Sequence, residues 1–205
     1  YATDKNALIQ ENQRLLDEST TEFTRDSNRY ALSVAYYENE DYAIASRILA
    51  PLLEKEPNRI SYVVTQAEIL TEQNESGQAI EFLNRHLEIN PNNNALTIAY
   101  VNALIESRAY TEAAEMLEEH SVHRPDDHHL WFQLAETWGQ AGNISKVHQS
   151  RAEYFMLNYD FRSAREQLQF ALRIESDNGA APAEQSRLRQ KVKEVEDRLI
   201  ALNEQ

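Results

Sequence analysis

The side chains best suited to metal chemistry gather in one short stretch, residues 122–131, which reads VHRPDDHHLW. The stretch holds three of the six histidines and two aspartates, and His120 lies just before it. Imidazole nitrogens and carboxylate oxygens are ligands that Zn²⁺ accepts. Zinc ligands on one helix need a spacing such as i, i+4, whereas His128 and His129 are adjacent and should point in different directions. We therefore expect no metal site, and His120 and His123 fit a helix end, where positive charge is favourable.

No arrangement of residues in the sequence matches a known catalytic motif. His-Glu-x-x-His, a glycine-rich phosphate loop, Gly-x-Ser-x-Gly and cysteine are all absent. Glu112, Glu115 and Glu119 recur at helical spacing, which fits a solvent-exposed helix face better than a pair of catalytic acids. With four glycines in all, few positions let the backbone wrap around a ligand. We expect that this chain is not an enzyme and holds no cofactor.

The composition of the 205-residue chain favours a helical protein. Glycine and proline, which sheet proteins need for their many turns, occur only four and five times. No apolar run approaches the roughly 18 residues of a membrane-spanning helix. Cysteine is absent, which excludes disulfides and fits either the cytoplasm or the periplasm. The sequence has no signal peptide and starts at Tyr1 rather than Met, so we expect a processed product or an excised fragment.

The net charge of −14 lies in the first two thirds of the chain. Residues 1–144 carry 24 acidic side chains against 10 lysines or arginines, whereas residues 145–205 carry 10 of each kind. A negative field repels phosphate groups, so we expect no nucleic-acid partner. Two interpretations remain open: a solvated surface that keeps the protein soluble, or a face that attracts basic segments of a partner.

A repeat of 34 residues organises the sequence. Three prolines mark it, and an alanine and a leucine recur at fixed distances before each proline. These positions are Pro57, Pro91 and Pro125; Ala45, Ala79 and Ala113; and Leu49, Leu83 and Leu117. Tyr42 and Tyr110 precede two of the alanines by three residues. A period of 34 residues is typical of the tetratricopeptide repeat, a helix–turn–helix unit.

Each recurring position has a physical role in a stack of helix pairs. The alanine lies where two helices cross closely, and the leucine one turn later fills the layer beneath it. The proline ends the second helix of a unit because it donates no backbone hydrogen bond. The polar residues that follow can cap the next helix, as Asp126 and Asp127 would after Pro125. The sequence therefore predicts an all-α fold: a right-handed tetratricopeptide superhelix of antiparallel helix pairs with a C-terminal capping helix.

The hydrophobic pattern divides the chain into three parts. Residues 1–25 should form an N-terminal amphipathic helix, residues 26–175 an array of four to five units, and residues 176–205 a loop and a capping helix. The first helix, about 4–23, should carry its apolar residues on one side: Leu8, Leu15, Leu16 and Phe23. Later helices are expected at about 27–39, 42–55, 60–73, 76–89, 94–107, 110–122, 127–140, 144–157, 161–174 and 182–203. Ala164 follows Val147 by half a repeat, so the helix at 144–157 should be shared by two units.

The last helix, which Pro182 should begin, carries one apolar stripe. Its members are Leu188, Val192, Val195, Leu199 and Leu202. A repeat array needs a terminal cap, because its last repeat otherwise exposes its inner layer. The same spacing would also suit a coiled-coil dimer. We expect capping and a monomer, with dimerisation through this stripe as the alternative.

Repeats of this kind offer a concave surface formed by the first helix of each pair. In this register the partner-binding groove would be lined by Tyr30, Val34, Tyr37, Val64, Glu68, Ile98, Asn102, Ile105, Phe132 and Glu136. The groove is apolar and aromatic with acidic spots, so it suits an extended or helical segment with hydrophobic anchors and a lysine or arginine. Some tetratricopeptide-repeat proteins grip a chaperone's C-terminal carboxylate with basic residues at such positions, and that clamp is absent here. Alternatively, some of these side chains belong to the core or touch a neighbouring domain.

Three segments carry a closer resemblance, which extends over nearly the whole chain. They read RYALSVAYYENEDYAIASRILAPLLEKEPN, NALIESRAYTEAAEMLEEH and LWFQLAETWGQAGNISKVHQSRAEYFMLNYDFRSAREQLQFAL. They resemble the C-terminal region of bacterial M48-type metalloproteases, the β-barrel assembly-enhancing protease family. The helix expected to serve two units, with its Arg-Ala-Glu-Tyr, is the most specific feature.

The resemblance implies a periplasmic protein in which an N-terminal zinc protease domain joins a repeat domain that binds substrates or assembly machinery. Its partners would be outer-membrane β-barrel proteins, the machinery that assembles them, or the chain's own protease domain. Zinc would lie only in a protease domain outside these 205 residues, because His-Glu-x-x-His has no counterpart in them. The alternative function is a general tetratricopeptide adaptor or scaffold that dimerises through its C-terminal helix.

Overall fold

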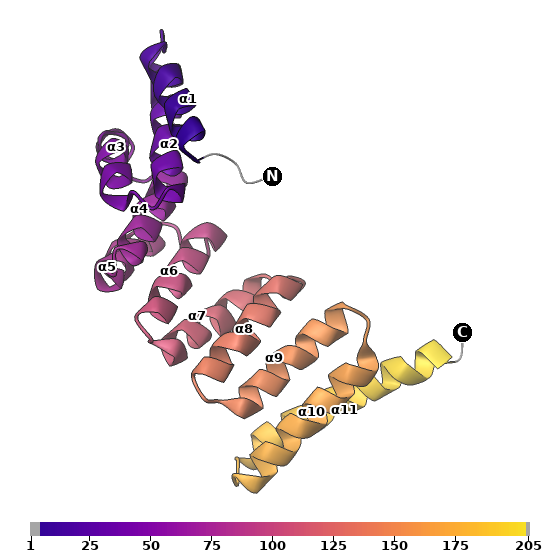
Figure 1. Ribbon diagram of the computed structural model, residues 1–205. Coiled ribbons are helices and arrows are strands. Elements are labelled where there is room, and N and C mark those ends of the chain that lie inside the picture. Colours follow the sequence, from indigo (N-terminus) through magenta and orange to yellow (C-terminus); the bar gives the residue numbers. More distant parts are fainter. Residues whose placement is uncertain (1–4, 204–205) are drawn as a thin grey trace. The chain divides into compact units, whose positions relative to one another are not determined.

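A computed structural model describes residues 5–203 of the chain, and within this range every regular element is a helix (Figure 1). The all-α expectation is therefore confirmed. The helices of the described residues are α1 (Lys5–Asp17), α2 (Glu22–Glu38), α3 (Tyr42–Lys55), α4 (Ile60–Glu72), α5 (Ser76–Ile89), α6 (Asn94–Glu106), α7 (Tyr110–His123), α8 (His128–Gln140), α9 (Ile144–Leu157), α10 (Phe161–Asp177) and α11 (Pro182–Asn203). Residues 1–4 and 204–205, which the first and last expected parts include, lie outside this description. In the part of the chain that is described, no helix is long and apolar enough to cross a bilayer.

The helices group into two compact units, Tyr1–Arg108 and Ala109–Gln205. The first unit contains α1 to α6, and the second contains α7 to α11. The structure thus divides the array expected over residues 26–175 after Arg108, in the short turn that precedes α7. The 34-residue register continues across this turn, so the period alone gives no sign of the division.

In the first unit, successive helices pack against one another, and α4 also packs against α2 and α6. Around α3 and α4 a core forms from side chains that are at most 1% exposed, namely Ala45, Leu49, Leu52, Tyr62 and Ile69. Removing these apolar side chains from water is the main favourable contribution to folding. Because α4 contacts both α2 and α6, the first helices of three successive pairs lie next to one another and can build one surface.

The repeat columns are buried as their spacing predicts. The alanines and leucines of the columns, each 0% exposed, are Ala45, Leu49, Ala79, Leu83, Ala113 and Leu117. In the last helix pair Ala164 and Leu168 continue the two columns and are also 0% exposed. Buried alanines allow the close helix crossings that the repeat requires, because a longer side chain would push the helices apart.

The N-terminal region differs from the expected single helix at 4–23. The first helix ends at Asp17, and a new helix begins at Glu22 with Thr21 as its N-cap. The backbone N–H of Thr24 donates to Thr21 Oγ1 at 3.2 Å, and the backbone N–H of Thr21 donates to Thr24 Oγ1 at 3.3 Å. This reciprocal cap satisfies two N–H groups that a continuous helix would have paired internally. Phe23 therefore belongs to α2, where it is 76% exposed, and does not extend the apolar side of α1.

The turns between successive helix pairs contain the three repeat prolines. In two of these three turns a residue after the proline caps the next helix with its side chain, as expected. Asn93 caps α6 by accepting the backbone N–H of Leu96 at 3.2 Å. Asp127 caps α8 by accepting the N–H groups of His129 and Leu130 at 3.1 and 3.3 Å. At the equivalent position before α4, Arg59 makes no side-chain cap. Side-chain caps satisfy the free N–H groups of a helix start and fix where the helix begins.

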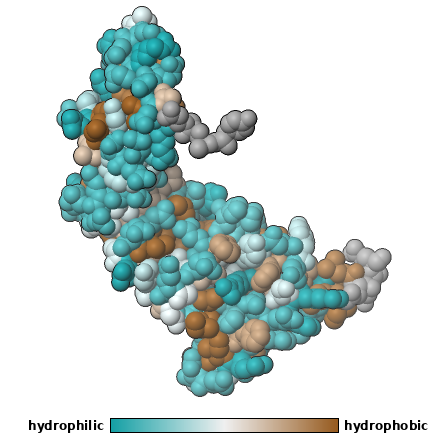
Figure 2. Space-filling model, viewed as in Figure 1, coloured by the Kyte–Doolittle hydropathy of each residue, from teal (hydrophilic) through white to brown (hydrophobic). Residues whose placement is uncertain are grey.

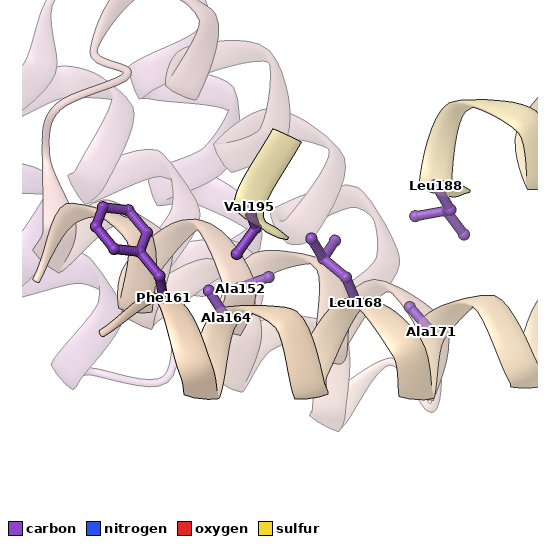
Figure 3. Packing of buried hydrophobic residues seen from close by; sticks show 7 residues of the cluster. All are labelled: Ala152, Phe161, Ala164, Leu168, Ala171, Leu188 and Val195. Atoms are coloured by element: carbon purple, nitrogen blue, oxygen red, sulfur yellow. The ribbon is translucent and has the colours of Figure 1, made fainter. Parts of the chain in front are cut away.

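In the second unit α9 packs against both α8 and α10, and α11 packs against α10. The core at this end contains Ala152, Phe161, Ala164, Leu168, Ala171, Leu188 and Val195. Figure 3 shows Leu188 and Val195 of α11 pointing toward the side chains of α10. Two further members of the C-terminal stripe, Val192 and Leu199, are partly buried against the same core. Four of the five stripe residues therefore cover the last helix pair within the chain, whereas Leu202 is 54% exposed.

Candidate partner-binding groove

The ten residues predicted to line a groove all lie on the first helices of their pairs. Eight belong to the first unit, and Phe132 and Glu136 on α8 belong to the second. The visible face of the molecule is mostly hydrophilic, and hydrophobic residues gather in small patches on it (Figure 2). Two local arrangements, one in each unit, contain five of the ten predicted residues.

A cavity of about 220 Å³ in the first unit is lined by α2, α4 and α6. Its lining residues are Tyr37, Glu68, Thr71, Glu72, Ala99, Asn102, Ile105 and Glu106. Four of these, Tyr37, Glu68, Asn102 and Ile105, are predicted groove residues, and the structure brings them together. We refer to this site as the α2–α4–α6 cavity.

Sequence reasoning missed the other four lining residues. Thr71 and Glu72 follow Glu68 by three and four residues on α4, and Ala99 precedes Asn102 by three residues on α6. Residues three or four positions apart share a helix face, so extending the predicted face by one turn would have found them. Glu106 lies at the end of α6 beside Ile105 and completes the rim.

The α2–α4–α6 cavity is electrostatically negative. Its lining includes three glutamates and no lysine, arginine or histidine. Burial raises the pKa of Glu68 above its ordinary value, and the nearby carboxylates of Glu38 and Glu72 raise it further. Burial, followed by the charges of Glu68 and Glu72, also raises the pKa of Tyr37 to about 12. At neutral pH the cavity therefore combines a neutral phenol with carboxylates that repel one another.

The remaining predicted residues of the first unit are partly buried beside this cavity's helices but do not line it. Tyr30 packs on the core, with its ring centroid 5.2 Å from that of Tyr62 and its hydroxyl 3.1 Å from Thr65 Oγ1. Val34, Val64 and Ile98 are likewise partly buried. Tyr30 thus has a packing role, one of the alternatives that the sequence left open.

In the second unit, Phe132 is 55% exposed and lies beside a ring of α9. The ring centroids of Phe132 and Tyr154 are 5.9 Å apart, and those of His128 and Tyr154 are 6.4 Å apart. Glu136 forms an ion pair with Arg151, with a shortest N–O distance of 3.6 Å. Sequence reasoning missed Tyr154 because the predicted groove residues came from the four preceding first helices and none was taken from the shared helix, α9. We refer to His128, Phe132 and Tyr154 as the aromatic patch.

The histidine-rich turn differs from expectation in two respects. The rings of His128 and His129 do not diverge: their centroids are 4.1 Å apart. His120 is only 3% exposed, and its pKa is lowered by burial and then by Arg124 and His123, so it does not supply the positive charge expected at the end of α7. Within residues 5–203 no group of three or more histidine, aspartate or glutamate side chains is arranged to hold a metal ion.

Residues 70–137 match a family model described as tetratricopeptide repeat. The chain is similar to the crystal structure of a tetratricopeptide repeat protein from Parabacteroides merdae ATCC 43184, with 13% identity, a TM-score of 0.58, and coverage of 92% of this chain and 78% of that chain. It is also similar to MamA, residue 41 to the end, from Desulfovibrio magneticus RS-1, with 15% identity, a TM-score of 0.56, and coverage of 84% and 95%. YrrB, a tetratricopeptide protein with an unusual peptide-binding site, gives 16% identity, a TM-score of 0.56, and coverage of 78% and 86%. Comparison with curated proteins finds no match.

The stacked helix pairs with buried alanine and leucine columns define the class of the protein as an all-helical repeat solenoid. Within it, residues 70–137 match the tetratricopeptide-repeat model, and solved tetratricopeptide proteins share the fold. At identities of 13–16% the similarity to those structures concerns the fold alone.

Proposed function

We propose that this chain is a protein-interaction domain that holds a segment of a partner polypeptide on the surface formed by α2, α4 and α6. The observation that carries the proposal is the α2–α4–α6 cavity, where four residues predicted from the repeat register meet in one concave site. Its lining combines a few apolar side chains with a larger number of polar and charged ones, so it suits a segment that carries both kinds of group. The aromatic patch of the second unit offers a separate apolar contact. The chain itself has no enzymatic role in this proposal.

We further propose that the parent protein is a periplasmic M48-type zinc metalloprotease that assists the assembly and quality control of outer-membrane β-barrel proteins. The segments quoted above, above all the one around Arg-Ala-Glu-Tyr, support this assignment. The partners would then be barrel proteins, their assembly machinery or the protease domain of the same protein. Zinc would belong to that protease domain and not to residues 1–205. The coding sequence upstream of Tyr1 provides the test, since the proposal requires a His-Glu-x-x-His motif there.

The interaction proposal is tested with variants of the cavity walls. Tyr37→Lys and Ile105→Lys each place a positive charge in the lining of the cavity, and we expect both to reduce capture of partner proteins from an envelope extract. The matched control is Ile89→Lys, at an exposed position at the end of α5. Circular dichroism identifies variants that fail to fold. Undiminished capture by folded Tyr37→Lys and Ile105→Lys variants would contradict a role of the cavity in partner binding.

The alternative of an adaptor that dimerises through residues 182–203 has less support. Leu188 and Val195 are 0% and 1% exposed within the chain, so the centre of the stripe is not available to a second copy. Sedimentation should accordingly find a monomer, and a dimer that dissociates on substitution of exposed Leu202 would favour the adaptor instead.

A further inference from the structure

We infer that the α2–α4–α6 cavity is a subsite for one basic side chain, lysine or arginine, of the polypeptide bound by the chain. This inference rests on the proposed interaction function and specifies what its central site recognises. The charge, the lining side chains and the volume of the cavity together support it.

The carboxylates of the cavity, those of Glu68, Glu72 and Glu106, form no ion pair with a cationic side chain of residues 5–203. Glu68 and Glu72 lie one turn apart on α4, where like charges repel each other. The nearest compensating contact is neutral: the hydroxyl of Tyr42 donates to Glu72 Oε2 at 3.4 Å.

Some carboxylates elsewhere in the same unit have cationic partners. Lys55 contacts both Glu22, at 2.6 Å, and Asp26. Arg14 contacts Glu11 at 2.6 Å and Glu18 at 2.8 Å. Cations of the unit compensate these four acidic groups, whereas the three glutamates of the concave cavity keep a negative charge that a partner's cation would neutralise.

The walls of the cavity fit the rest of a basic side chain. Tyr37 supplies an aromatic side chain, and Ala99 and Ile105 supply apolar side chains. Lysine and arginine have long apolar stems below their charged ends, and a cation also interacts favourably with an aromatic ring. A purely apolar side chain would instead remove the carboxylates from water without compensation, which is unfavourable. A carboxylate ligand would be repelled.

A bound metal ion is a less suitable occupant of the cavity. Within the described part of the chain, no three acidic or histidine side chains are placed to hold one ion together. The three glutamates come from two helices and border a space of about 220 Å³, which suits an extended organic cation. The site therefore favours an ammonium or guanidinium group on a chain over a single ion.

The experiment selects binders of the full 205-residue chain from a phage-displayed library of random short peptides. We expect the selected peptides to share one lysine or arginine flanked by apolar residues. Replacing that residue with citrulline or norleucine should weaken binding to the wild-type chain about tenfold, the loss expected for one hydrogen-bonded charge. The same replacement should have little effect on binding to the Glu68→Gln/Glu72→Gln double variant.

A matched control separates this site from general negative charge. Glu115→Gln/Glu119→Gln removes two exposed glutamates at the same four-residue spacing from α7, and this variant should bind the selected peptides as the wild type does. Selected peptides without a shared basic residue, or equal losses in the control and the cavity variant, would overturn the basic subsite but leave the interaction function standing. A library that gives no binder to the wild type would overturn both.

Discussion

Individual residues of the α2–α4–α6 cavity have properties that oppose folding and that would favour binding of the proposed basic side chain. Glu68 is partly buried near Glu38 and Glu72, and burial and these charges keep the pKa of its carboxyl above the ordinary value. An ionised carboxylate in that environment destabilises the folded chain. Sites for ligands often keep such unfavourable groups because binding compensates for them. Removing the charges of the cavity should therefore stabilise the folded chain and lower its affinity for basic ligands.

The Glu68→Gln variant tests this opposition through pH. A raised pKa means that the Glu68 carboxyl binds its proton more tightly in the folded chain than in the unfolded chain. Ionisation of Glu68 therefore lowers the stability of the folded chain as pH rises from the unfolded-state pKa through the folded-state pKa. We expect the variant to unfold with a free energy up to about 1 kcal/mol higher than the wild type at pH 7, a small value because Glu68 is partly exposed to solvent. The difference should shrink as pH falls and Glu68 becomes protonated.

Urea unfolding at several pH values measures this difference. The exposed Glu115→Gln variant is the control, and it should stay within about 0.5 kcal/mol of the wild type. A Glu68→Gln variant that is less stable than the wild type at pH 7 would show that the carboxylate has a stabilising partner.

The alanine columns make a second prediction at the scale of single residues. Ala45→Leu adds volume at a position that is 0% exposed in the core of the first unit, and we expect it to lower the free energy of unfolding by about 1–3 kcal/mol. Ala50→Leu makes the same change at an exposed position of the same helix and should be nearly neutral. Equal effects in denaturant unfolding would mean that Ala45 is not at a close helix crossing.

The helices themselves were largely predictable, because the 34-residue register and the apolar columns both reflect how helix pairs stack. The residues at which the helices begin and end were less predictable. The break before Glu22 depends on a reciprocal cap between Thr21 and Thr24, a local competition that hydrophobic periodicity does not reveal. Half of the cavity lining was predicted, and Thr71, Glu72, Ala99 and Glu106 were missed. Which turns of a helix face a cavity depends on how neighbouring helices pack, and the register of one helix does not contain that information.

The C-terminal helix gives a prediction at the scale of elements. Leu188 is 0% exposed and anchors α11 on the last core, so Leu188→Ala should lower the free energy of unfolding by about 2–5 kcal/mol. Leu202→Ala, in the same helix at a side chain that is 54% exposed, is the matched control and should have little effect. Thermal or urea unfolding measures both. A neutral Leu188→Ala variant would contradict the covering role of α11.

At the scale of the whole molecule, the division into two compact units has consequences for cooperativity. Tyr1–Arg108 and Ala109–Gln205 each have a core of their own. In repeat proteins stability is close to a sum of local terms, so local damage need not spread through the chain. The recognition site proposed here lies wholly within the first unit.

Hydrogen exchange of the Leu188→Ala variant tests this independence. We expect backbone amides of α9, α10 and α11 to exchange faster, because their shared core is weakened. Amides of α3 and α4 should keep their wild-type protection, since they belong to a separate core. A uniform increase across both units, measured by mass spectrometry of peptic fragments, would mean that the chain opens as one cooperative body.

The division into two units determines what tryptophan fluorescence can report. Both, Trp131 and Trp138, lie on α8: the indole N–H of Trp131 donates to the carbonyl of Pro125 at 2.8 Å, and Lys146 lies over the ring of Trp138. Their emission therefore monitors only the unit without the glutamate-lined cavity. Tyrosine signals, or a dye placed on α6, are needed to follow the first unit, which contains the cavity.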